Sequence, residues 1–309
     1  MEGIKEQDDT FAMIFTLDKD DDWRDERNWP KASPNYGVSV EPDKMREQLK
    51  KAINRGGRTE VTFKTKNLNL WVDAPETWIS DEKVVACNHG ITLDDLKGQT
   101  CYGGIDLASH VDINAFELYF PNIKGRPVLL SYFWVPEAKV EEMQDRVDYR
   151  KWVEEGWMNM TEGDVIDIDQ LVEDISEIIP QFNIVMVGFD PAKAYHGVVQ
   201  GLQKAGFEKI LQEFPQGIRY MSQPTREIER EVTAMEVDLM GNPVLRWMFS
   251  NAVTITDAND NIKFDKKKSQ NKIDGVVAAI NARGTYMSFE ANAPAEPYKE
   301  HTLRVLTNE

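Results

Sequence analysis

Cysteine is scarce in this chain of 309 residues, which contains only Cys87 and Cys101. Two cysteines cannot form a disulfide framework, and they fit a reducing compartment such as the cytoplasm. No run of about 18 uncharged apolar residues is present, so the sequence predicts no membrane span. The first nine residues are mostly polar and offer no apolar core of signal-peptide length, so we expect no secretion.

Two catalytic signatures are absent as well. The sequence has no Gly-x-Ser-x-Gly, which leaves a serine hydrolase unsupported. It also has no Gly-x-x-x-x-Gly-Lys-Ser/Thr, so a complete nucleotide-binding P-loop is missing. His89 lies two residues after Cys87, but the spacing to Cys101 and His110 matches no usual zinc site. We interpret these four residues as structural.

Positive charge is the minority charge, with 36 Lys and Arg against 53 Asp and Glu and a net charge of −17. This balance argues against a protein that coats nucleic acid non-specifically, because affinity for phosphate requires concentrated Lys and Arg. It does not exclude a nucleic-acid enzyme, whose carboxylate cluster itself makes the total negative. Such an enzyme needs a local basic track, and lysines do gather late in the chain, at Lys263, Lys266, Lys267, Lys268 and Lys272.

The remaining composition is that of a globular protein, with 41% hydrophobic residues, and the length predicts one large domain or two modest ones. Residues 41–53 are typical of a charged helix, and residues 63–72 indicate an extended linker. Apolar patterning then predicts strands at 102–109, 115–120, 127–135 and 183–191, helices at 138–155, 168–179, 191–205, 225–239, 243–251 and 271–287, and a hairpin at 253–264. Short turns favour antiparallel pairing of the first strands. The order predicts an α/β or α+β domain with a mixed sheet.

Three aspartates occupy chemically suggestive positions. Asp106 lies in the first strand of this domain, Asp190 closes the buried strand, and Asp274 lies in the first turn of the last helix. Taken singly, each is more simply explained as a turn or helix cap. Together they favour a metal site, because ligands gather at the carboxyl ends of strands and hard cations such as Mg²⁺ and Mn²⁺ prefer carboxylates. Asp112 is a possible extra ligand, although a turn role suits it better.

Several stretches of the chain, taken in order, resemble the C-terminal half of the large terminase subunit of tailed bacteriophages, the protein that packages and cuts viral DNA. The resemblance covers about residues 60–290 and rests on the segments Phe63 to Trp71, Gly104 to Leu107, Phe189 to Pro191, Ser222 to Glu229, Gly241 to Trp247, Asn251, and Lys272 to Gly275. The Asn-Pro-Val-Leu-Arg-Trp block at residues 242–247 is its most specific part.

The resemblance implies a ribonuclease H-like nuclease, with a mixed sheet flanked by helices, at residues 61–295. Residues 1–60 would then be an acidic tail and linker remnant of a missing ATPase motor, and residues 296–309 a C-terminal tail. The family cuts double-stranded DNA with two divalent ions, Mg²⁺ or Mn²⁺, held by the positions that match Asp106, Asp190 and Asp274. Lys266, Lys267, Lys268 and Lys272 would guide the DNA backbone.

The implied partners are double-stranded concatemeric DNA, the terminase small subunit and the portal of the procapsid, in the cytoplasm of an infected or lysogenic bacterium and without a membrane. Two other functions stay open. One is a different nuclease on the same fold, such as a junction resolvase, because fold does not fix substrate. The other is a non-catalytic docking module of a packaging motor.

Overall fold

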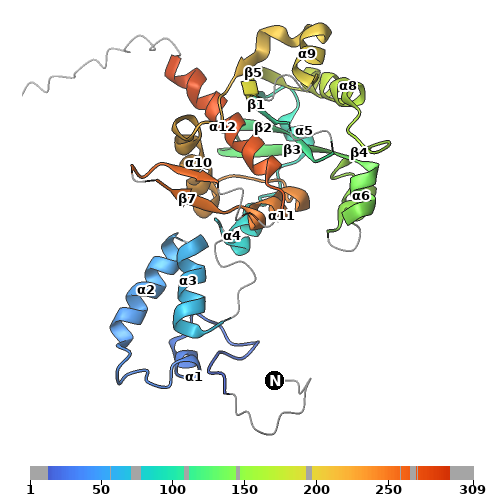
Figure 1. Cartoon of the computed structure of the whole chain (residues 1–309). Coiled ribbons are helices and arrows are strands. Elements are labelled where there is room, and N and C mark those ends of the chain that lie inside the picture. Colours follow the sequence, from blue (N-terminus) through green and yellow to red (C-terminus); the bar gives the residue numbers. More distant parts are fainter. Residues whose placement is uncertain are drawn as a thin grey trace, which may run out of the picture.

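The computed structural model describes residues 13–55, 57–70, 78–107, 111–143, 147–192, 197–257, 259–264, 269 and 271–292. A six-stranded sheet in the order β4-β3-β2-β1-β5-β6 forms the centre of the main domain (Figure 1). The strands are β1 (Thr100–Asp106), β2 (Asn114–Ile123), β3 (Arg126–Pro136), β4 (Asn159–Thr161), β5 (Asn183–Phe189) and β6 (Leu211–Glu213), and a separate hairpin pairs β7 (Thr254–Thr256) with β8 (Ile262–Phe264).

The sheet is mixed, as the sequence predicts. β1, β2 and β3 pair antiparallel through short connections, whereas the pairs β1–β5, β5–β6 and β3–β4 are parallel. The predicted antiparallel start is therefore confirmed. The short strands β4 and β6 are absent from the prediction, because three residues are too few to show a period of two.

Helices surround this sheet, and a smaller group of helices stands apart from it (Figure 1). Their bounds are α1 (Trp29–Ala32), α2 (Pro42–Arg55), α3 (Gly57–Leu68), α4 (Asp81–Ala86), α5 (Leu93–Leu96), α6 (Glu137–Met143), α7 (Tyr149–Glu154), α8 (Ile168–Ile178), α9 (Val198–Leu202), α10 (Ile218–Thr233), α11 (Pro243–Asn251) and α12 (Asp274–Asn292). Among the described residues, none of these helices is long and apolar enough to cross a membrane.

The two faces of the sheet have separate hydrophobic cores. Ala115 and Tyr119 of β2 join the core beneath α10, α11 and α12, whereas Phe116 and Leu118 join the core beneath α8 and α9. This alternation follows from the pleat, which sends successive side chains to opposite faces. Apolar residues therefore appear at consecutive positions of β2, as expected for a strand covered on both sides.

Helix α12 lies unusually close to β1 because that strand has a glycine at the contact. A Cβ atom placed on Gly104 would lie 2.2 Å from the carbonyl oxygen of Ala278 and 2.2 Å from the backbone nitrogen of Ala282. A side chain there would force the two backbones apart. The helix is apolar on nearly all sides, since residues 276–285 are all buried, as expected for a helix in the interior of a domain. Gly104 thus fixes how closely the start of α12 approaches the end of β1.

The N-terminal helices α1, α2 and α3 form a helical unit (residues 13–70) with its own hydrophobic core. Trp29 and Phe63 make an edge-on ring contact at its centre, 5.8 Å between centroids. The extended linker predicted from residue 63 is wrong as far as residue 68, because α3 continues to Leu68 and packs against α2. Residues 71–77 lie outside the described part. The helix predicted at 41–53 is confirmed as α2.

Two further predictions need correction. The segment 138–155 contains two helices, α6 and α7, rather than one. Helix α10 begins at Ile218 and runs through Pro224, although the sequence predicts a start at Thr225. The buried stripe of α10, which includes Ile228 and Val232, packs against α12 and holds the helix together despite the proline. The helices at 168–179 and 243–251 and the hairpin at 253–264 are confirmed to within a few residues.

Candidate functional site

The ends of two neighbouring parallel strands bring Asp106 and Asp190 to the same edge of the sheet. Ile105 of β1 pairs with Phe189 of β5, so the next residue of each chain segment is an aspartate. Parallel strands lie about 4.8 Å apart, which makes the two backbone positions neighbours. Gly104 and Gly188 both face α12, and the alternation of the strands places Asp106 and Asp190 on that same face.

Asp274, the first residue of α12, lies beside Asp106. Both aspartates line one cavity of about 220 Å³, which we name the carboxylate cavity; its lining is Asp106, Ser269, Asn271, Lys272, Ile273, Asp274 and Val277. The two positions are far apart in the sequence and come together because α12 packs along β1. Asp190 is not part of this lining among the described residues.

Buried amide side chains hold the start of α12 in place. Asn281 donates a 2.9 Å hydrogen bond from Nδ2 to the carbonyl oxygen of Ile105, the residue before Asp106. Asn251 donates a 3.1 Å bond from Nδ2 to the carbonyl oxygen of Lys272, two residues before Asp274. These bonds tie both carboxylates to the same rigid contact between helix and sheet, which is how precise sites are built.

The two strand-end aspartates have different surroundings. Asp106 is only 1% exposed, and Oδ1 accepts a 2.9 Å hydrogen bond from Nε2 of Gln216. Asp190 is half-buried, and Oδ1 accepts a 3.1 Å bond from the backbone N–H of Ala192. Sequence reasoning missed Gln216, because it follows β6, a strand too short to be predicted from the sequence.

Of the four lysines predicted to guide the DNA backbone, only Lys272 lies within the described residues. Lys272 lines the carboxylate cavity and forms an ion pair with Asp112. Asp112 also accepts a hydrogen bond from the backbone N–H of Ile113, which fits the turn role predicted for it. The other three predicted lysines, Lys266, Lys267 and Lys268, lie outside the described residues.

Tyr149 of α7 is a second residue that the sequence did not reveal. Its hydroxyl is buried and has no hydrogen-bond partner within the described part of the chain. Burial raises the pKa of Tyr149, and the nearby negative charges of Asp112 and Asp274 raise it further. The phenol therefore stays protonated and lies within electrostatic range of Asp274.

The donor chemistry of the carboxylate cavity fits a hard divalent cation. Asp106 and Asp274 supply carboxylate oxygens, and Ser269 and Asn271 supply neutral ones, which is the ligand class that Mg²⁺ and Mn²⁺ prefer. Within the described ranges, no three His, Cys, Asp or Glu side chains converge closely enough to form a ready metal site. The structure thus brings two of the three predicted aspartates into one cavity and the third to a neighbouring strand end.

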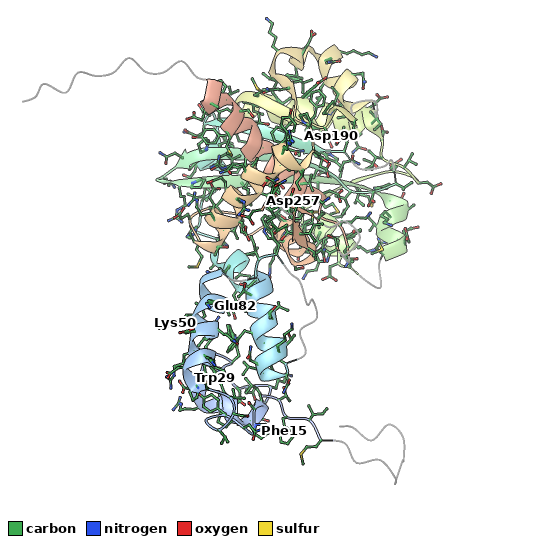
Figure 2. All side chains as sticks on the ribbon, turned by 60° about the vertical axis from the view of Figure 1, so that its left-hand side comes forward. Phe15, Trp29, Lys50, Glu82, Asp190 and Asp257 are labelled. Atoms are coloured by element: carbon green, nitrogen blue, oxygen red, sulfur yellow. The ribbon has the colours of Figure 1, made fainter. Side chains whose placement is uncertain are left out.

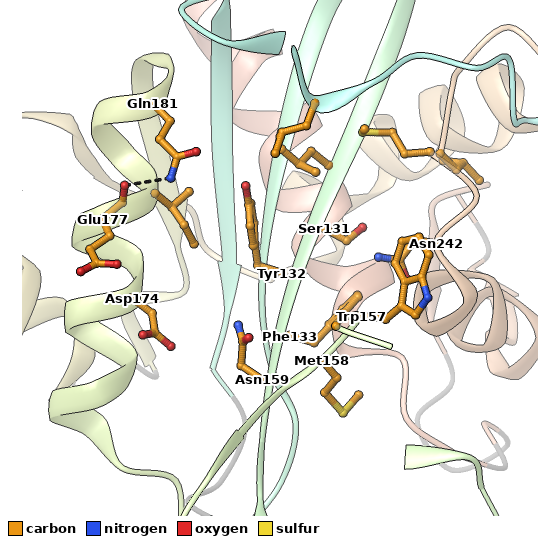
Figure 3. Close-up of a pocket in the computed structure, with 16 residues that line it drawn as sticks. Ser131, Tyr132, Phe133, Trp157, Met158, Asn159, Asp174, Glu177, Gln181 and Asn242 are labelled. Carbon is orange, nitrogen blue, oxygen red and sulfur yellow. Dashed lines mark hydrogen bonds between the residues drawn. The ribbon is translucent and has the colours of Figure 1, made fainter. Parts of the chain in front are cut away.

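A larger cavity of about 450 Å³ lies elsewhere, at the outer edge of β3 (Figure 3). Ser131, Tyr132 and Trp157 line it, and α8 contributes the carboxylates of Asp174 and Glu177. It contains none of the three predicted aspartates. Among the described residues, no Lys or Arg lines it beside these two carboxylates, whereas Lys272 lines the carboxylate cavity, so size alone does not make the larger cavity the place for phosphodiester chemistry.

Glu117 of β2 is a fully buried carboxyl outside the candidate site. Oε2 accepts a 2.9 Å hydrogen bond from Oγ of Ser131, and burial raises the pKa of Glu117 well above its ordinary value of 4.5. The folded protein therefore holds this proton more tightly than the unfolded chain, and the stability contribution of Glu117 falls as the pH rises above about 4.5. The amide in Glu117→Gln does not ionise, so its contribution to stability does not fall as the pH rises.

We therefore expect the stability of Glu117→Gln relative to the parent to increase with pH, by up to about 1.4 kcal/mol per pH unit. Urea unfolding of both proteins at pH 5, 6 and 7 measures this difference. A difference that is the same at all three values would contradict a raised pKa for Glu117.

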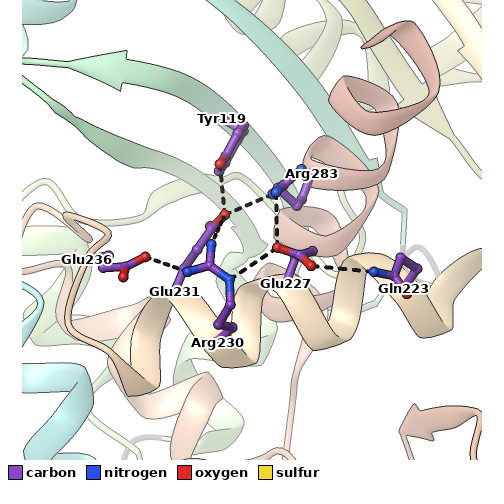
Figure 4. A network of polar contacts seen from close by, with 7 residues as sticks. All are labelled: Tyr119, Gln223, Glu227, Arg230, Glu231, Glu236 and Arg283. Atoms are coloured by element: carbon purple, nitrogen blue, oxygen red, sulfur yellow. Dashed lines mark hydrogen bonds and ion pairs between the residues drawn. The ribbon is translucent and has the colours of Figure 1, made fainter. Parts of the chain in front are cut away.

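A buried polar network joins α10 to α12 and β2 (Figure 4). Nε of Arg283 donates to Glu231 Oε1 at 3.0 Å, and the hydroxyl of Tyr119 donates to the same oxygen at 3.1 Å. The Arg283 guanidinium also lies over the rings of Tyr119 and Tyr286. Glu227 accepts from Nη2 of Arg283 at 3.4 Å. The network fixes the middle of the helix that carries Asp274.

The most specific sequence block, residues 242–247, has a structural explanation. Gly241 has a φ of +64°, which favours glycine. The side chain of Asn242 then caps α11 by accepting from the N–H groups of Val244 and Leu245, and Pro243 occupies the first turn. Arg246 forms two hydrogen bonds to Asp81 of α4. The block thus encodes the start of α11 and its attachment to α4.

Residues 5–290 match the family described as terminase large subunit, endonuclease domain. The chain therefore belongs to this family, as the resemblance indicated, and its mixed sheet is the ribonuclease H-like fold expected of it. Sequence relatives include Protein YmfN of Escherichia coli K12, 31% identical over 303 residues, and the terminase large subunit of enterobacteria phage HK97, 30% identical over 273 residues.

These alignments cover 94% and 88% of this chain but 66% and 53% of the relatives, so the chain spans about half to two thirds of their length. The crystal structure of the HK97 bacteriophage large terminase is similar in three dimensions, with a TM-score of 0.61 and 29% identity. That match covers 88% of this chain and 56% of the other.

Proposed function

We propose that this chain is a metal-dependent endonuclease that cuts double-stranded phage DNA during genome packaging. Membership of the terminase endonuclease family supports a nuclease of this class. The observation that carries the proposal is the carboxylate cavity, in which Asp106 and Asp274 face one space from a strand end and a helix start. Asp190, at the adjacent strand end, is the third carboxylate of the proposed site.

In this proposal, Asp106, Asp190 and Asp274 hold two divalent ions, Mg²⁺ or Mn²⁺. Such ions, when bound, acidify an attacking water and stabilise the departing 3′ oxygen of a phosphodiester. The chain's own residues orient the reactants. Gln216 keeps the Asp106 carboxylate turned in one direction, and Lys272 offers its ammonium group to a DNA phosphate at the rim of the cavity.

The substrate and partners belong to the same proposal. We infer concatemeric double-stranded DNA as the substrate, the terminase small subunit and the portal of the procapsid as partners, and the cytoplasm of the bacterial host as the place of action. Lys266, Lys267, Lys268 and Lys272 would steer the DNA backbone, and little sequence preference is expected because phosphate contacts do not read bases.

Cleavage of supercoiled plasmid by the purified chain in Mg²⁺, Mn²⁺ or EDTA tests the proposal. We expect nicked and linear products with either metal and none in EDTA, because the carboxylates alone offer no nucleophile. The Asp106→Asn variant serves as the control for a contaminating nuclease. Cleavage that persists in EDTA would contradict metal dependence. If the chain cuts neither linear nor branched DNA with any metal, the docking module becomes the better explanation.

A further inference from the structure

Helices α2 and α3 of the helical unit concentrate positive charge within an otherwise acidic chain. Residues 44–66, which span most of α2 and α3, contain eight Lys and Arg and only two Glu, whereas the whole chain has 36 basic and 53 acidic residues. The two helices pack against each other. Figure 2 shows Lys50 on α2, in the helical unit and away from the sheet that carries Asp190.

Several cations of the unit are already paired. Lys64 contacts Glu60 at 2.6 Å, and Arg46 contacts Glu26 at 2.8 Å. Lys31 and Lys44 also have carboxylate partners. Four exposed lysines of the unit are left without a carboxylate partner among the described side chains, namely Lys19, Lys50, Lys51 and Lys66. Their charge is available for a ligand.

Two of these lysines line a cavity of about 310 Å³ between α2 and α3, which we name the hairpin cavity. Its lining is Gln48, Lys51, Thr59, Thr62, Phe63, Lys66 and Asn67. No carboxylate is among these residues. The spacing explains the grouping, because Thr59, Thr62 and Lys66 lie at successive turns on one face of α3.

The uncharged polar residues of the hairpin cavity are also free to bind. The side chains of Gln48, Thr59, Thr62 and Asn67 make no hydrogen bond to the described part of the chain. All four are exposed or half-exposed. Lysine, threonine, glutamine and asparagine are among the side chains that contact phosphate oxygens of nucleic acids.

We propose that the hairpin cavity binds the phosphate backbone of duplex DNA, as a second contact outside the carboxylate cavity. The choice of DNA rests on the proposed function. An open surface with a further exposed cation at Lys50 suits a continuous polyanion better than a single small anion. The contact is independent of base sequence, because phosphates carry none. It holds the duplex without taking part in its cleavage.

Binding of a fluorescent duplex to the full chain in EDTA tests this contact separately from cleavage. Affinity is measured by anisotropy between 50 and 200 mM salt for the parent and for Lys51→Gln/Lys66→Gln. We expect weaker binding of all duplex sequences and a salt-dependence slope smaller by about two, since each lysine lost from a phosphate contact removes about one unit. Unchanged slopes, or no binding by the parent at low salt, would overturn the proposal.

Lys44→Gln/Lys97→Gln is the matched control, because it removes the same charge from two exposed, ion-paired lysines. The slope of its salt dependence should match that of the parent.

Titration with inorganic phosphate at constant ionic strength tests whether the cavity binds a free phosphate ion or the phosphates of DNA. If the Lys51→Gln/Lys66→Gln pair lowers phosphate affinity but leaves duplex binding unchanged, the cavity binds a free anion and the DNA contact is wrong. If the parent binds the duplex but does not cleave plasmid in Mg²⁺ or Mn²⁺, the result contradicts the proposed nuclease and leaves the DNA contact supported.

Discussion

Asp106→Asn is expected to lower plasmid cleavage about a thousandfold or more, which corresponds to about 4 kcal/mol of transition-state stabilisation. The amide has the shape of the carboxylate but lacks the negative charge that a hard cation requires. Because Asp106 is buried against the start of α12, water cannot replace the lost ligand freely. The carboxamide oxygen can still accept the hydrogen bond from Gln216, so the fold should persist.

The matched control is Asp94→Asn, which makes the same change at an exposed surface ion pair with Lys97. Its cleavage rate should equal that of the parent, and the melting temperatures of all three proteins should agree within a few degrees. Rates are compared under single-turnover conditions with Mg²⁺. A rate of Asp106→Asn close to that of the parent would show that the cutting centre lies elsewhere in the chain or in a contaminant.

The strand or helix that carries each of the three aspartates could be predicted from the sequence, but the distances between the aspartates could not. Asp106 lies in the first strand of the domain, Asp190 stands at the end of the buried strand, and Asp274 lies in the first turn of the last helix, as predicted. The exact bounds differ, because β1 ends at Asp106, β5 ends at Phe189 and α12 begins at Asp274. Their relative positions depend on the register of β1 against β5 and on the close approach allowed by Gly104. Neither the strand register nor the close approach of helix and strand can be read from the local pattern of the sequence. Whether the three carboxylates act together stays a prediction.

The elements that were mispredicted share a physical cause, namely long-range packing that overrides a local signal. Residues 63–68 have apolar side chains only at Phe63 and Leu68 and show no clear helical period, yet they are helical because Phe63 packs against Trp29 and Trp23. Pro224 marks a helix start by local rules, yet α10 passes through it because its buried stripe packs against α12. The hydrogen-bonded pair of Glu231 and Arg283 could not be predicted from the sequence either, because the two residues are 52 positions apart.

Arg283→Met is expected to destabilise the folded protein by about 3–5 kcal/mol, because it removes the cationic partner of a buried carboxylate. Glu231 is only 2% exposed, and burial already raises its pKa. Without Arg283, keeping Glu231 charged becomes still less favourable, so the folded protein holds a proton there to higher pH. The loss of stability should therefore be larger at pH 8 than at pH 5, where Glu231 can be neutral in the folded protein.

Urea unfolding at both pH values measures this effect, and Arg230→Met is the matched control. Arg230 contacts the same Glu227 and Glu231 but is half-exposed, so its removal should cost less than about 1 kcal/mol. Adding Glu231→Gln to Arg283→Met should restore part of the loss and remove its pH dependence, because no buried charge is then left unpaired. Equal losses for the two arginine variants would mean that burial does not set the strength of this network, and α12 would then be held mainly by its apolar contacts.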